Sequence, residues 1–97
     1  GEENWEIGEF TAYNATIEQC GKADGITASG KKVKQGRTLA CPPEYKLGTK
    51  IEIEGRGVYE CQDRGGAIKG NRFDIYFDSV AEAKQFGRQK INYKIIK

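Results

Sequence analysis

Hydrophobic and polar residues alternate over several short stretches of this chain, which is the pattern of half-buried β-strands. The clearest case is TKIEIEG at residues 49–55, where two isoleucines alternate with two glutamates. The polar, glycine-rich stretch from Cys20 to Lys32 is predicted to be a long loop. Further strands, each short and bounded by glycine, proline or polar residues, are predicted at residues 9–16, 37–41, 57–63, 72–77 and 90–96.

One helix is predicted over residues 78–87, DSVAEAKQFG. Ser79 at the N-cap and Glu82 three residues later match a capping box, and Gly87 supplies the C-terminal stop. Six strands and one short helix predict a compact all-β barrel in a single domain, because 97 residues suffice for one modest core. The apolar residues Val80, Ala83 and Phe86 are expected to lie roughly on one face of the helix.

Charged residues make up 31% of the chain and nearly cancel, leaving a net charge of +2. Proteins that bind nucleic acid or anionic membranes usually show concentrated basic surface, so neither partner is expected. The basic run GKKVKQGR at residues 30–37 is interpreted as a solvated loop. The sequence shows no apolar stretch near the roughly 20 residues of a membrane helix and no signal peptide, so no membrane insertion is expected.

The chain has no histidine, which excludes histidine acid–base chemistry and most zinc sites. Its three cysteines, Cys20, Cys41 and Cys61, are too far apart for a C-x-x-C metal knuckle or redox pair. We therefore expect neither a metal ion nor a cofactor. The cysteine count fits either one disulfide plus one thiol in an exported protein or three thiols in a cytosolic one.

Aspartate is a poor strand former, yet Asp74 lies inside the apolar strand RFDIYF. Strand alternation explains this position, since it turns Asp74 and Tyr76 outward when the neighbouring apolar residues face the core. By the same alternation, Asp63 in YECQD is expected to share a face with Tyr59 and Cys61. The residues expected in the core are Phe73, Ile75 and Phe77, with Asp78 on the outer face.

The two aspartates have two interpretations. They either accept backbone hydrogen bonds in turns, or line a groove in which a carboxylic acid with a raised pKa protonates a glycosidic oxygen. In the second case, the rings of Tyr13, Tyr76 and Trp5 are candidates for stacking on sugars.

The segment QDRGGAIKGNRFDIYF at residues 62–77 resembles the signature of the 3D domain, a family named for three aspartates. Such domains occur in Gram-positive and phage cell-wall proteins, in stationary-phase survival proteins and in MltA-type lytic transglycosylases. The resemblance predicts a 3D-type domain over residues 9–97, preceded by an N-terminal extension over residues 1–8. Shorter matches are FTAY (10–13), GITASG (25–30), GRTLA (36–40), LGTKIEIEG (47–55) and EAKQFGR (82–88).

This resemblance implies a six-stranded double-psi β-barrel with one short helix. It also implies action on the glycan strands of peptidoglycan by a monomeric domain outside the cell, in the wall, in a Gram-positive or phage-encoded protein. A lytic transglycosylase breaks the β-1,4 bond between N-acetylmuramic acid and N-acetylglucosamine without water, giving a 1,6-anhydro product. The alternatives are a non-catalytic glycan-binding module on the same barrel and a hydrolase that uses Asp63 as a partner.

The family's catalytic aspartate, in its D-I/L-Y segment, matches Asp74, which would act first as acid and then as base. A second family aspartate matches Asp63, whose implied role is to hold hydrogen bonds and to keep Asp74 protonated by like-charge repulsion. The residues implied to contact the substrate are Tyr13, Thr27, Gly65, Gly66, Lys69 and Tyr76, although Lys69 is interpreted equally well as a solvated lysine.

The third family aspartate is missing. Family members commonly read A-V-D-P where this chain reads ACPP, so Pro42 occupies the aspartate position and offers neither a carboxylate nor an N–H. In the family this segment converges with D-x-G-G, which implies a disulfide between Cys41 and Cys61 and leaves Cys20 unpaired. The competing pair is Cys20 with Cys41.

Overall fold

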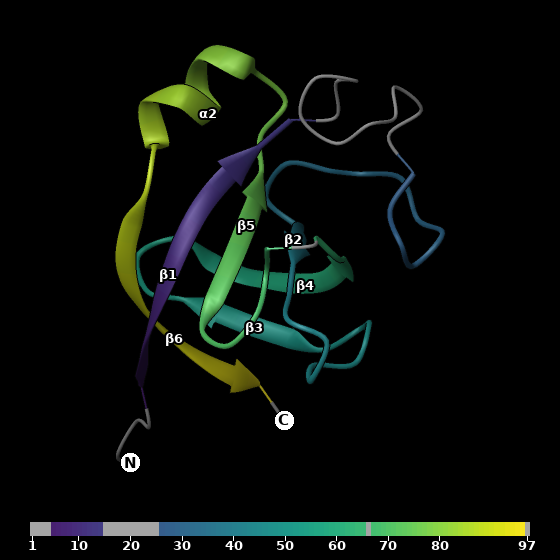
Figure 1. The fold of residues 1–97 in the computed structure, drawn as a ribbon, viewed down its shortest axis with the longest axis vertical. Coiled ribbons are helices and arrows are strands. Elements are labelled where there is room, and N and C mark those ends of the chain that lie inside the picture. Colours follow the sequence, from purple (N-terminus) through teal and green to yellow (C-terminus); the bar gives the residue numbers. More distant parts are fainter. Residues whose placement is uncertain (1–4, 15–25, 66, 97) are drawn as a thin grey trace.

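The computed structural model describes residues 5–14, 26–65 and 67–96. The strands within these residues form one closed barrel in the order β1-β5-β2-β4-β3-β6. The β1/β5 and β2/β4 pairs are parallel, and the other neighbours are antiparallel. Within the described residues, the predicted six-stranded double-psi β-barrel with one short helix is confirmed. Its elements (Figure 1) are β1 (Glu6–Tyr13), β2 (Thr38–Ala40), β3 (Lys50–Ile53), β4 (Gly57–Asp63), β5 (Arg72–Tyr76), α2 (Val80–Phe86) and β6 (Gln89–Ile96).

Each predicted strand forms, and the ends that the structure describes lie within three residues of those expected. β1 begins at Glu6 rather than Glu9, because residues 6–8 pair with β6. Residues 15–25, which include the predicted end of this strand and Cys20, lie outside the described residues. The division of the chain between residues 8 and 9 therefore stays a prediction.

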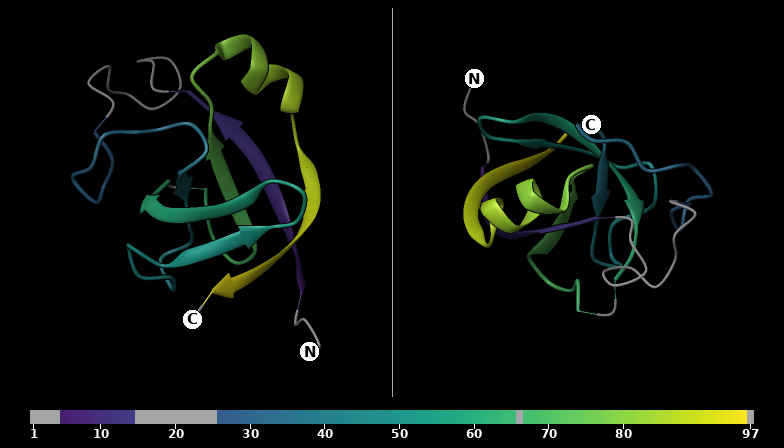
Figure 2. Two further views of the ribbon diagram at one scale, coloured as in Figure 1. Left: turned by 180° about the vertical axis from the view of Figure 1, so that it is seen from behind. Right: turned by 90° about the horizontal axis from the view of Figure 1, so that it is seen from above.

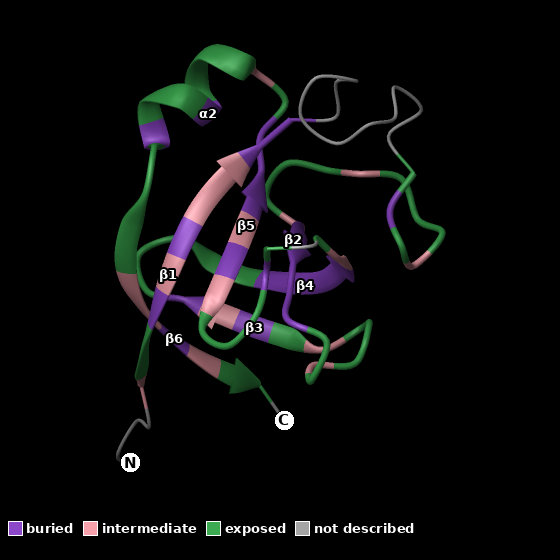
Figure 3. Cartoon of the chain, in the orientation of Figure 1, coloured by how far each residue is buried: buried purple, intermediate pink, exposed green. Residues whose placement is uncertain are grey.

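Side chains from alternate strand positions fill the barrel interior, as the sequence pattern predicts. The fully buried rings of Phe10 and Phe73 stack at 5.1 Å, and the ring of Tyr93 packs edge-on against Phe73 at 4.8 Å. A Cβ at Gly8 would lie 2.9 Å from the Tyr93 ring, so glycine lets β1 approach that ring closely. Figure 3 shows the resulting alternation of buried and half-buried positions along β5.

Helix α2 lies across the end of the barrel where β1 and β5 end (Figures 1 and 2). The Ser79 hydroxyl accepts the backbone N–H of Glu82 at 3.2 Å, and Gly87 ends the helix with a φ of 64°, as predicted. Val80 is exposed while Ala83 and Phe86 are buried, so the prediction that the three residues share one face is wrong for Val80. At about 100° per residue, Val80 and Phe86 point roughly 120° apart around the helix axis. The residues that α2 buries are Ala83 and Phe86.

Within the described part of the chain, no helix combines the length and apolar character that crossing a membrane requires.

Candidate active site

Asp74 lies on the outer face of the barrel, in the middle of β5. Its neighbours Phe73 and Ile75 are fully buried in the interior, so strand alternation turns the carboxyl group outward, as predicted. Asp74 pairs with Thr11 of β1 on one side and with Ala40 of β2 on the other. The residue is partly exposed, so its carboxyl group lies within the barrel wall yet reaches solvent.

The surroundings of Asp74 favour its neutral form. Burial, the largest cause, together with the nearby negative charge of Asp63, raises the pKa of Asp74 from 3.8 to about 6. Two groups oppose this rise by stabilising the charged form: the Thr11 hydroxyl, which donates to Oδ1 at 2.9 Å, and the positive charge of Arg72. A carboxylic acid with such a pKa holds its proton closer to neutral pH than an exposed aspartate, as a general acid requires.

Asp63 ends β4, and three donors hold its carboxylate. The backbone N–H groups of Ala28 and Arg64 donate to Oδ1 at 3.1 and 2.9 Å, and the Tyr13 hydroxyl donates to Oδ2 at 3.1 Å. Hydrogen bonds to both oxygens fix the orientation of the carboxylate. This carboxylate is therefore already engaged by the protein, which suits a positioning role better than activation of a water.

The pairing of β2 with β4 explains how Asp63 reaches this surface. Two successive residues of β2 pair with Cys61 and Asp63, so Gln62 is an extra residue in β4. Tyr59 and Cys61 belong to the barrel core, whereas the carboxylate of Asp63 meets the outer face of β1. The prediction that Asp63 shares the face of Tyr59 and Cys61 is therefore wrong, because the extra residue redirects the end of the strand.

Tyr13 and Tyr76, the predicted sugar-stacking residues, pack against each other on the outer side of β1 and β5. Their rings meet edge to face at 5.6 Å, and each residue is only 7% exposed. Tyr13 uses its hydroxyl to hold Asp63, and contact of either ring with a sugar stays a prediction. Trp5 lies at the other end of β1, where its ring contacts the ammonium group of Lys94 at 4.7 Å.

The glycine-rich segment after β4 packs back onto this tyrosine pair through the buried side chain of Ile68. A Cβ at Gly65 would lie 2.9 Å from Cγ1 of Ile68, so a glycine at this position leaves room for the isoleucine. Lys69 is exposed on the same segment, and Gly66 lies outside the described residues. The structure thus gives Gly65 a packing role, and substrate contact by Gly65 and Lys69 remains an expectation.

Residues 26–32 form a turn beside Asp63. Thr27 is buried, and its hydroxyl donates to the carbonyl oxygen of Lys31 at 2.7 Å. The backbone N–H of Thr27 donates to the same oxygen at 2.9 Å. These bonds close the turn that presents the Ala28 N–H to Asp63. Contact of Thr27 with substrate stays a prediction.

Sequence reasoning missed a polar network that fastens this turn. The carboxylate of Glu60 lies 2.9 Å from Nζ of Lys50 and 3.1 Å from Nζ of Lys31, and it also accepts the amide of Gln62. The hydrogen bonds from Lys50 and Gln62 are the largest causes that lower the pKa of Glu60 from 4.5 to about 2. Glu60 and Gln62 alternate along β4 with the core residues Tyr59 and Cys61, and the loop that covers them could not be read from a local pattern. The network also includes the Thr38 hydroxyl, which donates to Gln62.

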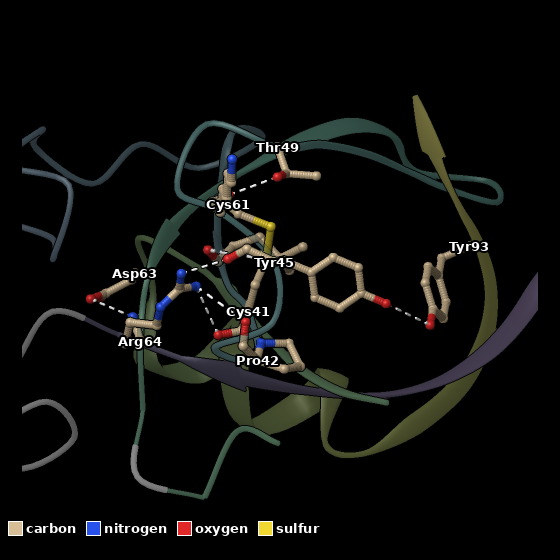
Figure 4. Close-up of a disulfide and its surroundings, with 10 residues drawn as sticks. Cys41, Pro42, Tyr45, Thr49, Cys61, Asp63, Arg64 and Tyr93 are labelled. Atoms are coloured by element: carbon tan, nitrogen blue, oxygen red, sulfur yellow. Dashed lines mark hydrogen bonds between the residues drawn. A yellow bond between two sulfur atoms is a disulfide. The ribbon is translucent and has the colours of Figure 1, made fainter. Parts of the chain in front are cut away.

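Pro42 is fully buried just after β2, at the position of the missing third aspartate. Next to it, the guanidinium of Arg64 donates to the carbonyl oxygens of Cys41 and Pro42 at 3.2 and 3.3 Å and to that of Tyr45 (Figure 4). Sequence reasoning missed this role of Arg64, although its position directly after Asp63 was a possible signal. Arg64 thus ties the segment after β2 to the end of β4.

A disulfide joins Cys41 to Cys61, which is the pairing that the resemblance implies (Figure 4). Both residues are fully buried, and their Cα atoms are 5.6 Å apart. The bridge fastens the segment that contains Pro42 to β4, two residues before Asp63. The unpaired state of Cys20 stays a prediction, since that residue is not described.

No group of three or more acidic, cysteine or histidine side chains suited to a metal ion is found among residues 5–14, 26–65 and 67–96. The candidate site is centred on Asp74, whose pKa is raised, and on Asp63, whose carboxylate is held by three donors.

The family model of the 3D domain matches residues 37–97, which contain β2 to β6 and α2. The chain belongs to the 3D domain family.

Two curated relatives from Bacillus subtilis are similar over most of this chain. The putative cell wall shaping protein YabE is 34% identical over 90 residues, covering 89% of this chain and 21% of that protein. The cell wall-binding protein YocH is also 34% identical over 90 residues, covering 89% of this chain and 30% of that protein. The chain thus spans less than a third of the length of either relative.

Solved structures of two larger proteins contain a similar barrel. MltA from E. coli matches with a TM-score of 0.62 and 22% identity over 77% of this chain and 28% of its own. The lytic transglycosylase LtgG of Burkholderia pseudomallei matches with a TM-score of 0.55 and 30% identity over 76% of this chain and 26% of its own. The likeness to MltA shows the shared fold.

Proposed function

We propose that this domain is a peptidoglycan lytic transglycosylase in which Asp74 acts as general acid and then as general base. The observation that carries the proposal is the environment of Asp74, which raises its pKa to about 6 on the outer face of the barrel. The 30% identity to the lytic transglycosylase LtgG supports the reaction class. The relatives named for cell wall shaping and cell wall binding support peptidoglycan as the partner.

The reaction needs one carboxyl group that changes roles. Protonated Asp74 donates its proton to the glycosidic oxygen as the bond between that oxygen and C1 of N-acetylmuramic acid breaks. The resulting carboxylate then takes the proton of the C6 hydroxyl on the same sugar, whose oxygen bonds to C1. The 1,6-anhydro ring closes, Asp74 is protonated again, and no water is consumed.

The state of Asp63 favours this route over hydrolysis. A hydrolase needs a second carboxylate to activate water or to attack the sugar. Both oxygens of Asp63 already accept hydrogen bonds from the Tyr13 hydroxyl and from two backbone N–H groups. Asp63 is therefore assigned to positioning, and its charge helps keep Asp74 protonated.

Digestion of purified peptidoglycan with the domain should yield fragments that end in 1,6-anhydro-N-acetylmuramic acid. Each such fragment is lighter by one water than its hydrolytic counterpart, because the substrate's own hydroxyl replaces water as the nucleophile. Mass spectrometry of the soluble fragments, before and after borohydride reduction, measures this directly. Fragments with only reducible ends would instead identify a hydrolase.

Pro42 favours one second candidate, a non-catalytic glycan-binding module. A buried proline at the position of the third aspartate removes a carboxylate from the site. Retention of bound glycan with no fragments released by wild-type protein, under conditions in which a known lytic transglycosylase is active, would select the binding module.

Cleavage should depend on pH through the protonated form of Asp74. We expect kcat/KM to be highest below about pH 6 and to fall by about tenfold per unit above it, because ionised Asp74 cannot donate a proton. Thr11→Val removes a hydrogen-bond donor that lowers the pKa of Asp74. The decrease of kcat/KM with pH should therefore shift to higher pH in this variant. Rates that are flat from about pH 5 to about pH 8, or a decrease unmoved by Thr11→Val, would contradict this assignment.

We further propose that the domain acts as a monomer outside the cell, at the wall. The disulfide between Cys41 and Cys61 is consistent with an oxidising compartment, since cytosolic thiols are generally kept reduced.

A further inference from the structure

A hollow of about 380 Å³ lies beside α2, apart from the outer face that carries Asp74. Three segments line it: α2 and the strand ends next to it, the turn between β3 and β4, and the loop before β2. This size falls at the lower end of the range of ligand pockets, about 300–1,000 Å³. It suits a short peptide end better than a run of several sugars.

Arg56, in the turn between β3 and β4, is held in this hollow by aromatic rings. Its guanidinium carbon lies 4.7 Å from the ring centroid of Phe86 and 5.9 Å from that of Phe77. Within the part of the chain that the structure describes, the guanidinium has no hydrogen-bond or ion-pair partner. The aromatic rings hold this guanidinium in place, and its N–H groups donate to no described residue. It is therefore well suited to bind a carboxylate through two parallel hydrogen bonds.

The hollow also contains an acid and amides. Glu82 contributes a carboxylate from the first turn of α2, where its backbone N–H is capped by Ser79. The side chains of Glu82 and Gln85 have no hydrogen-bond or ion-pair partner among the described residues. Gln35 uses its carbonyl oxygen to accept the N–H of Asp78 at 2.8 Å, which leaves its NH2 group as a donor. One cation, one anion and neutral amides match a ligand that carries both a carboxylate and an ammonium group.

We propose that this hollow binds the free end of a wall stem peptide, with the peptide carboxylate on Arg56 and an ammonium group near Glu82. The proposal rests on the proposed function, because peptidoglycan carries short peptides with both groups along its glycan strands. Phe77 follows Asp74 by three residues, which corresponds to about 10 Å along an extended chain. A glycan strand cleaved at Asp74 therefore carries its peptides within reach of the hollow.

Titration of the isotopically labelled protein with the tripeptide Lys-D-Ala-D-Ala, followed by NMR, tests the site. Chemical-shift changes should concentrate on Arg56, Glu82 and Gln85. The C-terminal amide of the same peptide should bind at least about tenfold more weakly, because it loses the charge-assisted hydrogen bonds to the guanidinium. Equal affinity for acid and amide, or shifts confined to other residues, would overturn the proposal.

A matched pair of variants separates this site from general electrostatics. Arg56→Gln should weaken tripeptide binding at least about tenfold. Lys84→Gln removes the same charge from an exposed position on α2 and should leave binding unchanged. An equal loss in both variants would overturn the proposal. If Arg56→Gln does not fold, the acid and amide comparison on the wild-type protein still decides.

Cleavage assays separate this proposal from the proposed function. With intact peptidoglycan, Arg56→Gln should raise KM and leave kcat unchanged, whereas glycan strands stripped of peptides should be cleaved equally by the variant and the wild type. If the tripeptide does not bind but cleavage that requires Asp74 persists, the hollow has another role and the proposed function stands. If the tripeptide binds but no glycan is cleaved, the result contradicts the proposed reaction and supports the peptide site.

Discussion

Asp74→Asn should abolish the release of anhydro fragments, with a loss of at least about 10²–10⁴-fold. Asparagine has nearly the same shape, and its carbonyl oxygen still accepts the Thr11 hydroxyl that lies 2.9 Å from Oδ1 of Asp74. The amide cannot donate an acidic proton to the glycosidic oxygen. Asp63→Asn should cost less, about 10- to 1,000-fold, because it disturbs the hydrogen bonds and the charge that support the acid. Fragment release quantified by mass spectrometry compares the two variants with the wild type.

The stability of Asp74→Asn provides the control for folding. The pKa of Asp74 is raised in the folded protein, so its favourable contribution is complete below pH 3.8 and is lost as pH rises to about 6. At higher pH the folded state carries a charge in the barrel wall that the unfolded chain exposes to water. Asp74→Asn should therefore raise the free energy of unfolding by on the order of 1–3 kcal/mol near pH 8, and have little effect near pH 3.

Urea unfolding at the two pH values measures this difference. A variant that loses both cleavage and stability near pH 8 would argue against Asp74 as a buried acid. A fully active variant would make Asp74 a structural residue and favour the binding module.

The orientation of Asp74 could be predicted from the sequence because it depends on a local pattern. Phe73 and Ile75 flank it in a strand of period two, so once they occupy the core Asp74 must point outward. The same rule fails for Asp63 because β4 contains the extra residue Gln62 relative to β2. That shift depends on strands far apart in the chain, and a local pattern carries no information about it.

The hydrogen-bond partners of the two aspartates are distant in the sequence, so a local pattern could not predict them either. Tyr13 reaches Asp63 across 50 positions of the chain, and Ala28 reaches it across 35. The parallel pairing of β1 with β5 brings Thr11 to Asp74. Such contacts are set by how the barrel closes, so the sequence indicated which aspartates are candidates for the chemistry but not the hydrogen bonds that surround them.

Replacing both Cys41 and Cys61 by alanine should lower the free energy of unfolding by about 3 kcal/mol, because the open chain gains conformational freedom when unfolded. The bridge joins residues 20 positions apart and is fully buried, so loss of packing adds to this effect. For a domain of this size the melting temperature should fall by roughly 10–20 °C. Calorimetry of the double variant measures the loss, and reduction of the wild type should reproduce most of it.

Cys20→Ala is the matched control and should change little, since Cys20 is predicted to be unpaired. A comparable loss in Cys20→Ala, a Cys20-linked peptide in a non-reducing tryptic map, or three alkylatable thiols in the native oxidised protein would contradict the pairing.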